Sequence, residues 1–295
     1  MNSYPYCVLD VFTTEKYKGN PLAVVFTVSD LDLQVYQDIS KEFGYSETSF
    51  IYYSKPGKAL KVRSFTPTGF EVSGVGHNLL GAISAALLSN MAIFGEQEGK
   101  QFVIMKDETI YLSIEYPYDN RPFIGMLQRP ATMHASVDPI IVAPAITLHP
   151  DELVSGDLLP TVVKTEVAHL MLPVKSADIL NKAIPGKTLL RELAATYEFE
   201  GVYCFAVLDK DPAFLAEARF FNPGIGIEED PATGSAAAPL GGFLFKKKYI
   251  NSNVTYKILQ GVKMGQPSVI KFEVKKEGIW ISGSAVIIME GTIYG

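Results

Sequence analysis

The chain has 295 residues and a formal net charge of -6, and 47% of its residues are hydrophobic. A chain of this length is expected to form two ordinary domains, and its hydrophobic content excludes a disordered chain. Its lysines and arginines are scattered, so it lacks the basic patch with which proteins bind nucleic acid.

In the first half, strand patterns surround two helical patterns. Apolar and β-branched runs predict a hairpin of residues 6–12 and 21–27. Apolar residues at helical spacing predict a helix over residues 32–43, which Gly44 should end. Further strands are expected over residues 49–53, 61–65, 101–105 and 109–116.

The second helical pattern lies in a stretch over residues 72–95 that contains no Asp, Glu, Lys or Arg. Its length would span a bilayer, but it contains His77 and Asn78, and a similar stretch over 234–245 is too short to cross one. We interpret both stretches as core helices, the first over residues 79–94, and expect no membrane partner.

A proline-rich segment over residues 120–143 predicts a crossover between two halves. We place the boundary near residue 125, which gives a first half of residues 1–125 and a second half of 126–282; the C-terminal strand near 283–295 could rejoin the first half. Helices are expected over 177–197, and strands over 161–173, 201–208, 254–259, 268–274 and 278–288. Strands and helices do not alternate regularly, so the pattern predicts an α+β fold rather than a dinucleotide-binding fold.

One motif occurs twice. Residues 63–67 read Arg-Ser-Phe-Thr-Pro and residues 219–223 read Arg-Phe-Phe-Asn-Pro, and each is followed by a glycine that opens an uncharged stretch. This indicates an internal duplication in which a strand, a polar loop and a core helix recur. Two helix N-termini, with their unpaired N–H groups and partial positive charge, favour a small anionic ligand.

Glu47 is the first candidate for chemistry. It stands between Ser46 and Thr48, directly before an apolar strand. Burial there would raise the pKa of a carboxyl group towards neutrality and suit it to acid/base catalysis. The alternative is a solvated turn residue, since most glutamates are exposed.

Three further candidates lie at the starts of the two core helices. His77 follows Gly76, and a helix N-terminus favours the neutral imidazole, which can move a proton; alternatively, the histidine simply caps the helix. Asp230 and Ser235 bracket the start of the second helix, where Ser235 could be an ordinary N-cap. Asp230 belongs to three consecutive acids beside an anion-binding helix start, an arrangement that costs electrostatic energy unless they serve a purpose or face solvent.

The sequence lacks the marks of other mechanisms. It shows no metal-ligand spacing among its four histidines, no nucleotide-binding glycine motif and no nucleophile elbow, so no cofactor and no metal are expected. Cys7 and Cys204 are far apart and are expected to be buried thiols in a reducing compartment. The N-terminal residues do not form a secretion signal, which favours a cytoplasmic protein.

Taken together, these segments resemble the PhzF-like family of phenazine biosynthesis, whose fold is shared with diaminopimelate epimerase. The residues that carry the resemblance are Gly19-Asn-Pro-Leu-Ala, Ser46-Glu47-Thr48, Phe65-Thr-Pro67, Gly76-His77, Asp230-Pro-Ala-Thr-Gly-Ser235, Gln260-Gly261 and Gly283-Ser-Ala. The resemblance implies two pseudo-symmetric domains, each a curled, mostly antiparallel sheet around a central helix. The active site would lie in the cleft between them.

The resemblance also implies the roles of individual residues. Glu47 would be the catalytic acid/base, assisted by His77, Asp230 and Ser235. Substrate-binding groups would come from Gly76, Asn78, Gly234 and Ala236. The reaction would be a cofactor-independent isomerisation of a small cyclic or amino carboxylate, and homodimers are common among such relatives.

Two alternatives stay open at this point. The fold could serve as a ligand-binding or regulatory protein without turnover, or as an epimerase with one base. A racemase with two cysteines is excluded, because Val75 stands where such enzymes carry the first cysteine and no cysteine lies near the second position. Pro239 early in the second helix could delay its start or kink it, and Gln266 stands where the family often has arginine.

Overall fold

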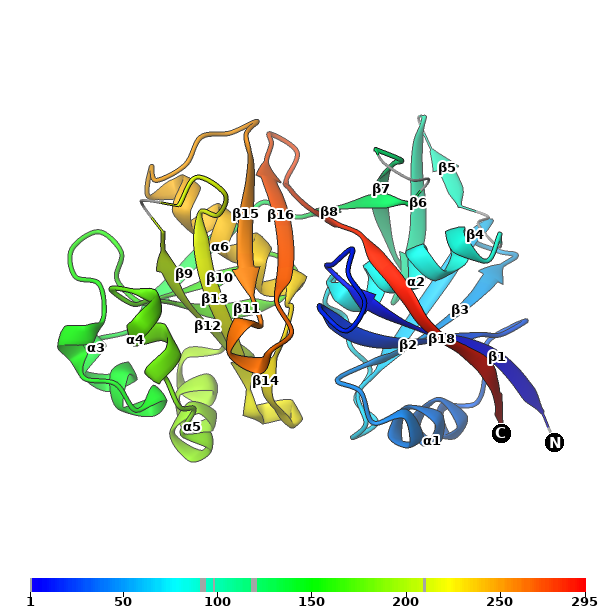
Figure 1. Ribbon diagram of the computed structural model, residues 1–295, viewed down its shortest axis with the longest axis horizontal. Helices are drawn as coiled ribbons and strands as arrows, with labels where there is room; N and C mark the ends of the chain where they lie inside the picture. Colours follow the sequence, from blue (N-terminus) through cyan, green and yellow to red (C-terminus); the bar gives the residue numbers. More distant parts are fainter. Residues whose placement is uncertain (1, 91–93, 98, 118–120, 209–210) are drawn as a thin grey trace. The chain divides into compact units, whose positions relative to one another are not determined.

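The computed structural model describes residues 2–90, 94–97, 99–117, 121–208 and 211–295. The chain divides into two compact units (Figure 1). Unit 1 is formed by Met1–Leu127 together with Ser282–Gly295, and unit 2 by Gln128–Ile281. Both units combine mostly antiparallel strands with a buried central helix, so the predicted α+β class is confirmed.

Unit 1 begins with the predicted hairpin, and its two strands pair antiparallel. The first strand also pairs with the last strand of the chain, which runs beside it in Figure 1. The second strand pairs parallel with a third, and the third antiparallel with a fourth. The strands of this unit are β1 (Ser3–Val11), β2 (Asn20–Phe26), β3 (Thr48–Ser54), β4 (Ala59–Phe65), β5 (Gly95–Gln97), β6 (Lys100–Met105), β7 (Glu108–Glu115), β8 (Phe123–Gln128) and β18 (Ala285–Tyr294).

Unit 1 has two helices among the residues that the structure describes. Helix α1 (Leu33–Phe43) ends as predicted at Gly44, which adopts φ 66° and donates its N–H to the Ser40 carbonyl. Helix α2 (His77–Leu88) is the central helix, and ten of its 12 residues are buried. It starts two residues before the predicted helix and ends at Leu88; residues 91–93 of that prediction lie outside the described part of the chain.

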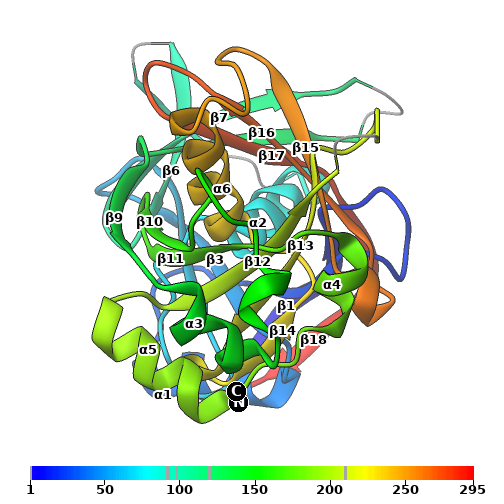
Figure 2. The same cartoon turned by 90° about the vertical axis from the view of Figure 1, so that its left-hand side faces the viewer.

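Unit 2 packs helices on both faces of its sheet (Figure 2). Central helix α6 (Gly234–Lys246) covers one face, and an apolar core under α4 (Ala177–Lys182) and α5 (Lys187–Tyr197) covers the other. Pro185 and Gly186 separate α4 from α5, since a proline and a glycine cannot continue the helix well. Unit 2 also contains the short helix α3 (Pro139–Val142) and the strands β9 (Thr132–Ser136), β10 (Thr161–Lys164), β11 (Ala168–Pro173), β12 (Gly201–Val207), β13 (Ala216–Asn222), β14 (Ile227–Asp230), β15 (Thr255–Gln260), β16 (Ser268–Val274) and β17 (Ile279–Gly283).

The internal duplication is visible in the strand register. In both units, four strands pair in the order antiparallel, parallel, antiparallel: β1 to β4 in unit 1, and β10 to β13 in unit 2. The phenylalanine of the repeated motif occupies the same place, because Phe65 pairs with Thr48 and Phe221 pairs with Val202. The crossover predicted over residues 120–143 contains β8 and β9, and its residue 120 is not among the described residues.

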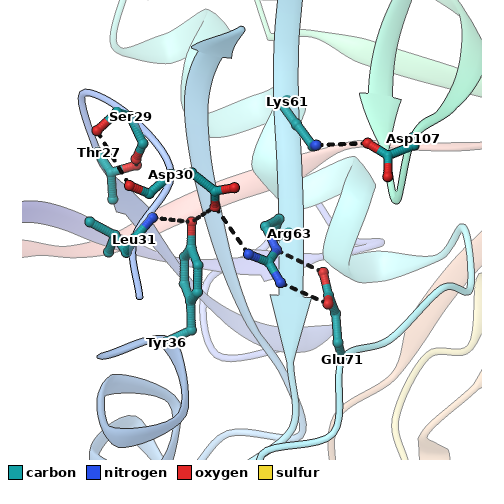
Figure 3. A network of polar contacts seen from close by, with 9 residues as sticks. All are labelled: Thr27, Ser29, Asp30, Leu31, Tyr36, Lys61, Arg63, Glu71 and Asp107. Atoms are coloured by element: carbon teal, nitrogen blue, oxygen red, sulfur yellow. Dashed lines mark hydrogen bonds and ion pairs between the residues drawn. The ribbon is translucent and has the colours of Figure 1, made fainter. Parts of the chain in front are cut away.

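The repeated arginine has the same partner type in both units. In unit 1 the Nε and Nη2 atoms of Arg63 each donate to one oxygen of Glu71, at 2.8 Å (Figure 3). In unit 2 Arg219 does the same with Glu229, at 2.8 and 2.7 Å. Each guanidinium also lies over the phenylalanine of its own motif, with its carbon about 5 Å from the ring centroid. We call these pairs the arginine clamps; each ties the strand of the motif to the segment before a central helix.

The clamps differ in their third partner. Arg63 Nη1 donates to Asp30, which also accepts the Tyr36 hydroxyl (Figure 3). Arg219 Nη1 donates instead to the carbonyls of Leu180 and Ala183 at the end of α4. The Arg219 clamp is the more deeply buried of the two, with an arginine side chain 6% exposed against 18% for Arg63.

Candidate active site

The first group of candidate residues lies where β3 begins and α2 begins. Glu47 directly precedes β3 and is 8% exposed, so the alternative of a solvated turn residue is wrong. His77 is the first residue of α2 and is 4% exposed. Ser46 Oγ lies 3.4 Å from His77 Nε2, and the Ser49 hydroxyl donates to the Asn78 carbonyl at 3.1 Å. These contacts join the segment of Glu47 and the strand that follows it to the helix that begins at His77. We call this region the Glu47 half-site.

The imidazole of His77 is neutral in this environment. Burial lowers its pKa from the usual 6.5 to about 3, because the charged ring loses its hydration. The ring is therefore neutral, as predicted, and burial is the cause. The helix cap proposed as an alternative is Gly76, and His77 is the residue that follows it.

We expect the His77 imidazole to show no titration between pH 8 and 5, as measured by NMR with His77→Gln for assignment. His169 is also buried and its pKa is also lowered to about 3. Both pKa values lie below the pKa of a histidine in the unfolded chain. As the pH falls, the two histidines are therefore protonated first in the unfolded chain. The free energy of unfolding should therefore be independent of these groups above pH ~6.5 and fall by about 1.4 kcal/mol per pH unit for each histidine below it. A His77 midpoint between pH 5 and 7 would contradict this.

Asn78 organises the loop before α2. Its Oδ1 accepts the N–H groups of Gly76 and Leu79, and its Nδ2 donates to the Gly74 carbonyl. The family resemblance implied that Gly76 binds substrate, but the Gly76 N–H already donates to Asn78. The side chain of Asn78 stabilises the shape of the helix start.

The second group lies at the start of α6, and we call it the Asp230 half-site. Thr233 occupies the N-cap position, Gly234 is the first helical residue and Ser235 the second, so the alternative of Ser235 as the N-cap is wrong. Ser235 is partly exposed, whereas Gly234 and Ala236 are buried. Pro239 does not delay the helix; lacking an N–H, it cannot donate to the Ser235 carbonyl four residues earlier.

The three consecutive acids have three different environments. Glu228 is exposed and pairs with Lys187, and Glu229 belongs to the arginine clamp. Asp230 is 4% exposed, and its Oδ2 accepts the Thr233 hydroxyl at 2.5 Å. Lys187 and Arg219 thus compensate the charges of Glu228 and Glu229. Asp230 is the acid that accepts a hydrogen bond at the start of the helix.

A buried amide lies behind this half-site. Gln260 Nε2 donates to the Asp230 carbonyl at 2.7 Å and to Thr233 Oγ1 at 3.0 Å. Its Oε1 accepts the Thr233 N–H at 3.2 Å and the Tyr203 hydroxyl at 2.9 Å. Burial raises the pKa of Tyr203 well above its usual value, so the phenol keeps its proton and acts as a donor. We call these four residues the Gln260 network; the sequence interpretation assigned roles to Asp230 but not to the other three.

Gly261 allows this network to form, because it brings the end of β15 against the loop of the half-site. It has φ +79°, and a Cβ atom there would lie 2.7 Å from the Pro231 carbonyl oxygen and 2.3 Å from that of Gln266. We expect Gly261→Ala to lower the free energy of unfolding by about 1–3 kcal/mol, from strain and displaced backbone. Urea unfolding measures this loss. Gly265→Ala is the matched control: it has φ +71° but nothing within 4 Å, so an equal loss would show that close contact is unimportant.

The cysteines take no part in either half-site. Cys7 and Cys204 are buried free thiols, as predicted, and burial raises the pKa of each to about 12. Val75 and Thr233 stand directly before the helix-opening glycines. Within the described residues, no group of three or more His, Cys, Asp or Glu side chains could hold a metal ion, and no helix is long and apolar enough to cross a membrane.

Comparison with known proteins agrees with this architecture. Residues 9–291 match the model of the PhzC-PhzF family, described as phenazine biosynthesis-like protein. The chain belongs to the PhzC-PhzF family. The predicted resemblance is therefore confirmed, and the family match extends over both units.

Relatives that match this chain along nearly their whole length are named as isomerases. An uncharacterized isomerase from Clostridium acetobutylicum is 31% identical, over 99% of each chain. The trans-2,3-dihydro-3-hydroxyanthranilate isomerase of Pseudomonas aeruginosa is 28% identical, over 98% of this chain and 99% of the relative. The structure of a PhzF-family protein from Bacillus anthracis covers 100% of both chains with a TM-score of 0.86 at 22% identity, which supports the fold. Both of these curated relatives are named as isomerases, and the predicted class of enzyme is confirmed.

Proposed function

We propose that this PhzC-PhzF protein is a cofactor-independent isomerase that moves a proton on a small cyclic or amino carboxylate. The observation that carries the proposal is the Glu47 half-site, where a buried carboxyl group lies directly before the start of β3 and a neutral imidazole at the start of the adjoining helix. A carboxyl group and a neutral imidazole are groups that move protons in acid/base catalysis.

In this proposal, Glu47 removes a proton from a carbon atom beside a carboxylate or a conjugated system. The electron pair of the broken C–H bond moves into the conjugated system, and a proton returns to a different carbon. The neutral His77 ring donates to a substrate oxygen or relays a proton, while burial keeps water from exchanging with it. No oxidant or reductant is needed, since the substrate and product have the same atoms.

The proposal also gives roles to the residues of the Asp230 half-site. Asp230 and Ser235 would hold polar groups of a substrate, and a helix N-terminus would stabilise negative charge that develops when a proton leaves. Helix N-terminal N–H groups suit a carboxylate, which is why we propose an anionic substrate.

Proton NMR in deuterated buffer tests the proposal. The first compound is trans-2,3-dihydro-3-hydroxyanthranilate, named in the Pseudomonas relative, followed by a panel of small cyclic and amino carboxylates. Deuterium incorporation with a shifted double bond supports the isomerase. Incorporation that changes only the handedness of a carbon would replace it with a one-base epimerase. Binding without any exchange would favour a ligand-binding protein.

A further inference from the structure

The Gln260 network satisfies a buried amide with four hydrogen bonds. The two hydrogens of Nε2 are used by the Asp230 carbonyl and Thr233 Oγ1, and the two lone pairs of Oε1 by the Thr233 N–H and the Tyr203 hydroxyl. Gln260 is 0% exposed, and Asp230 and Thr233 are 4% and 6% exposed. Removing one partner would leave another polar group buried without its bond, which is costly.

The chemistry of the partners fixes the orientation of this amide. A flipped amide would place Nε2 against the Thr233 N–H and Oε1 against the Asp230 carbonyl, which gives a donor facing a donor and an acceptor facing an acceptor. Because Nε2 must then donate to Thr233 Oγ1, the hydroxyl hydrogen is free to point to Asp230 Oδ2, 2.5 Å away. Gln260 therefore directs the Thr233 hydroxyl at the carboxylate.

Unit 1, the other copy of the duplication, shows that the fold does not require the Gln260 network. Val72 follows the clamp residue Glu71, as Asp230 follows the clamp residue Glu229. Each also contacts the residue that follows the clamp arginine: the Val72 N–H donates to the Ser64 carbonyl, and Asp230 pairs with Phe220. Val75 precedes the glycine that opens the first core-helix stretch, as Thr233 precedes Gly234. At both positions, unit 1 has valine where unit 2 has a buried polar side chain.

The register gives the counterpart of Gln260 itself. In unit 2, Ala218 pairs with Gln260, and in unit 1, Val62 pairs with Met105. Ala218 and Val62 each precede the clamp arginine, so Met105 occupies the Gln260 position, and it is 2% exposed. The counterpart of Tyr203 is Ser49, whose hydroxyl bonds to Ser64 and to the Asn78 carbonyl.

We propose that Gln260 and Thr233 are positioning residues that hold the Asp230 carboxylate in place for the reaction. The inference rests on the proposed function, because it treats Asp230 as part of the site. Unit 1 forms the same strands and central helix with valine and methionine at the equivalent positions. The buried polar groups of unit 2 therefore have a role other than folding. That role is to hold the Asp230 carboxylate in a fixed direction at the start of α6.

Unit 1 supplies the test variants. Thr233→Val and Gln260→Met install the residues found at the equivalent positions, and methionine has nearly the length of glutamine. Thr233→Ser keeps the hydroxyl and is the matched control, and Tyr203→Phe removes one donor to Gln260 without touching Thr233 or Asp230. Crystal structures, urea unfolding and the kinetics of deuterium exchange are measured for each.

The crystal structures decide the inference without any substrate. We expect the Asp230 carboxylate to leave its wild-type position in Thr233→Val and Gln260→Met and to keep it in Thr233→Ser. An unchanged Asp230 side chain in both of the first two variants would overturn the proposal. If Gln260→Met fails to fold, the comparison of Thr233→Val with Thr233→Ser still shows whether the Thr233 hydroxyl positions the Asp230 carboxylate.

Kinetics separate positioning from a purely structural role. We expect kcat/KM to fall at least tenfold in Thr233→Val and to stay within about twofold of wild type in Thr233→Ser at the same temperature. A lower urea midpoint with unchanged kcat/KM would mean that the network only stabilises the fold. A wild-type protein without exchange on any compound counts against the proposed function alone, because the crystal structures still decide whether Asp230 is positioned.

Discussion

Glu47→Gln is expected to lower the rate of deuterium exchange by about 10³-fold while the protein stays folded. Glutamine keeps the shape and the buried volume of the side chain but cannot accept the proton, and general acid/base catalysis contributes about 10²–10⁴-fold. Because Glu47 is 8% exposed, water has little access to take its place. Single-turnover exchange measured by proton NMR gives the rate, and circular dichroism reports the fold.

Glu71→Gln is the matched control for this prediction. It removes a charge from a carboxyl group in the same unit, but Glu71 belongs to the arginine clamp and not to the Glu47 half-site. We expect the control to lose stability and to keep its exchange rate within a few-fold. If Glu47→Gln retained its rate within a few-fold, Glu47 would not be the base.

The second large effect is expected on stability. Arg219→Met should lower the free energy of unfolding by about 3–5 kcal/mol, the range for breaking a buried ion pair from one side. Methionine keeps an apolar stem but leaves the Glu229 carboxylate and the carbonyls of Leu180 and Ala183 without their donor. Equilibrium unfolding in urea measures the change.

Arg63→Met tests the same clamp in unit 1. Its arginine and glutamate side chains are 18% and 24% exposed, against 6% and 17% for the pair in unit 2, so solvent compensates more of the loss. We expect a smaller decrease, of about 1–2 kcal/mol. A larger loss at Arg63 than at Arg219 would show that burial does not set the strength of these clamps.

Local patterns predicted the framework of this protein well. Gly44 ends α1 because a glycine adopts positive φ without strain, and that information lies in one residue and its neighbours. The repeated motif with its arginine, phenylalanine and proline predicted the duplication, since the same side chains recur at the same spacing. The position of Glu47 before an apolar strand left both burial and a solvated turn open, and the structure shows that Glu47 is buried.

Contacts between distant segments could not be predicted in this way. Gln260 lies 27 residues from Thr233, 30 from Asp230 and 57 from Tyr203, so no local pattern joins them. The sequence analysis did not predict the ion pair of either motif arginine, because its glutamate partner is eight or ten residues away across a loop. The start of the second core helix at Gly234 was predicted correctly, but the alternative of Ser235 as its N-cap was wrong, since Ser235 has a suitable side chain by type and yet lies inside the helix.

The order of the strands has a consequence for synthesis on the ribosome. All of unit 2 comes from one continuous segment, Gln128–Ile281, whereas unit 1 is completed by Ser282–Gly295. Strand β1 emerges near the beginning of translation, but β18, its partner over residues 285–294, emerges last. One edge of β1 therefore stays unpaired while more than half of the protein is made, and the unit translated second is the first to have its full set of strands.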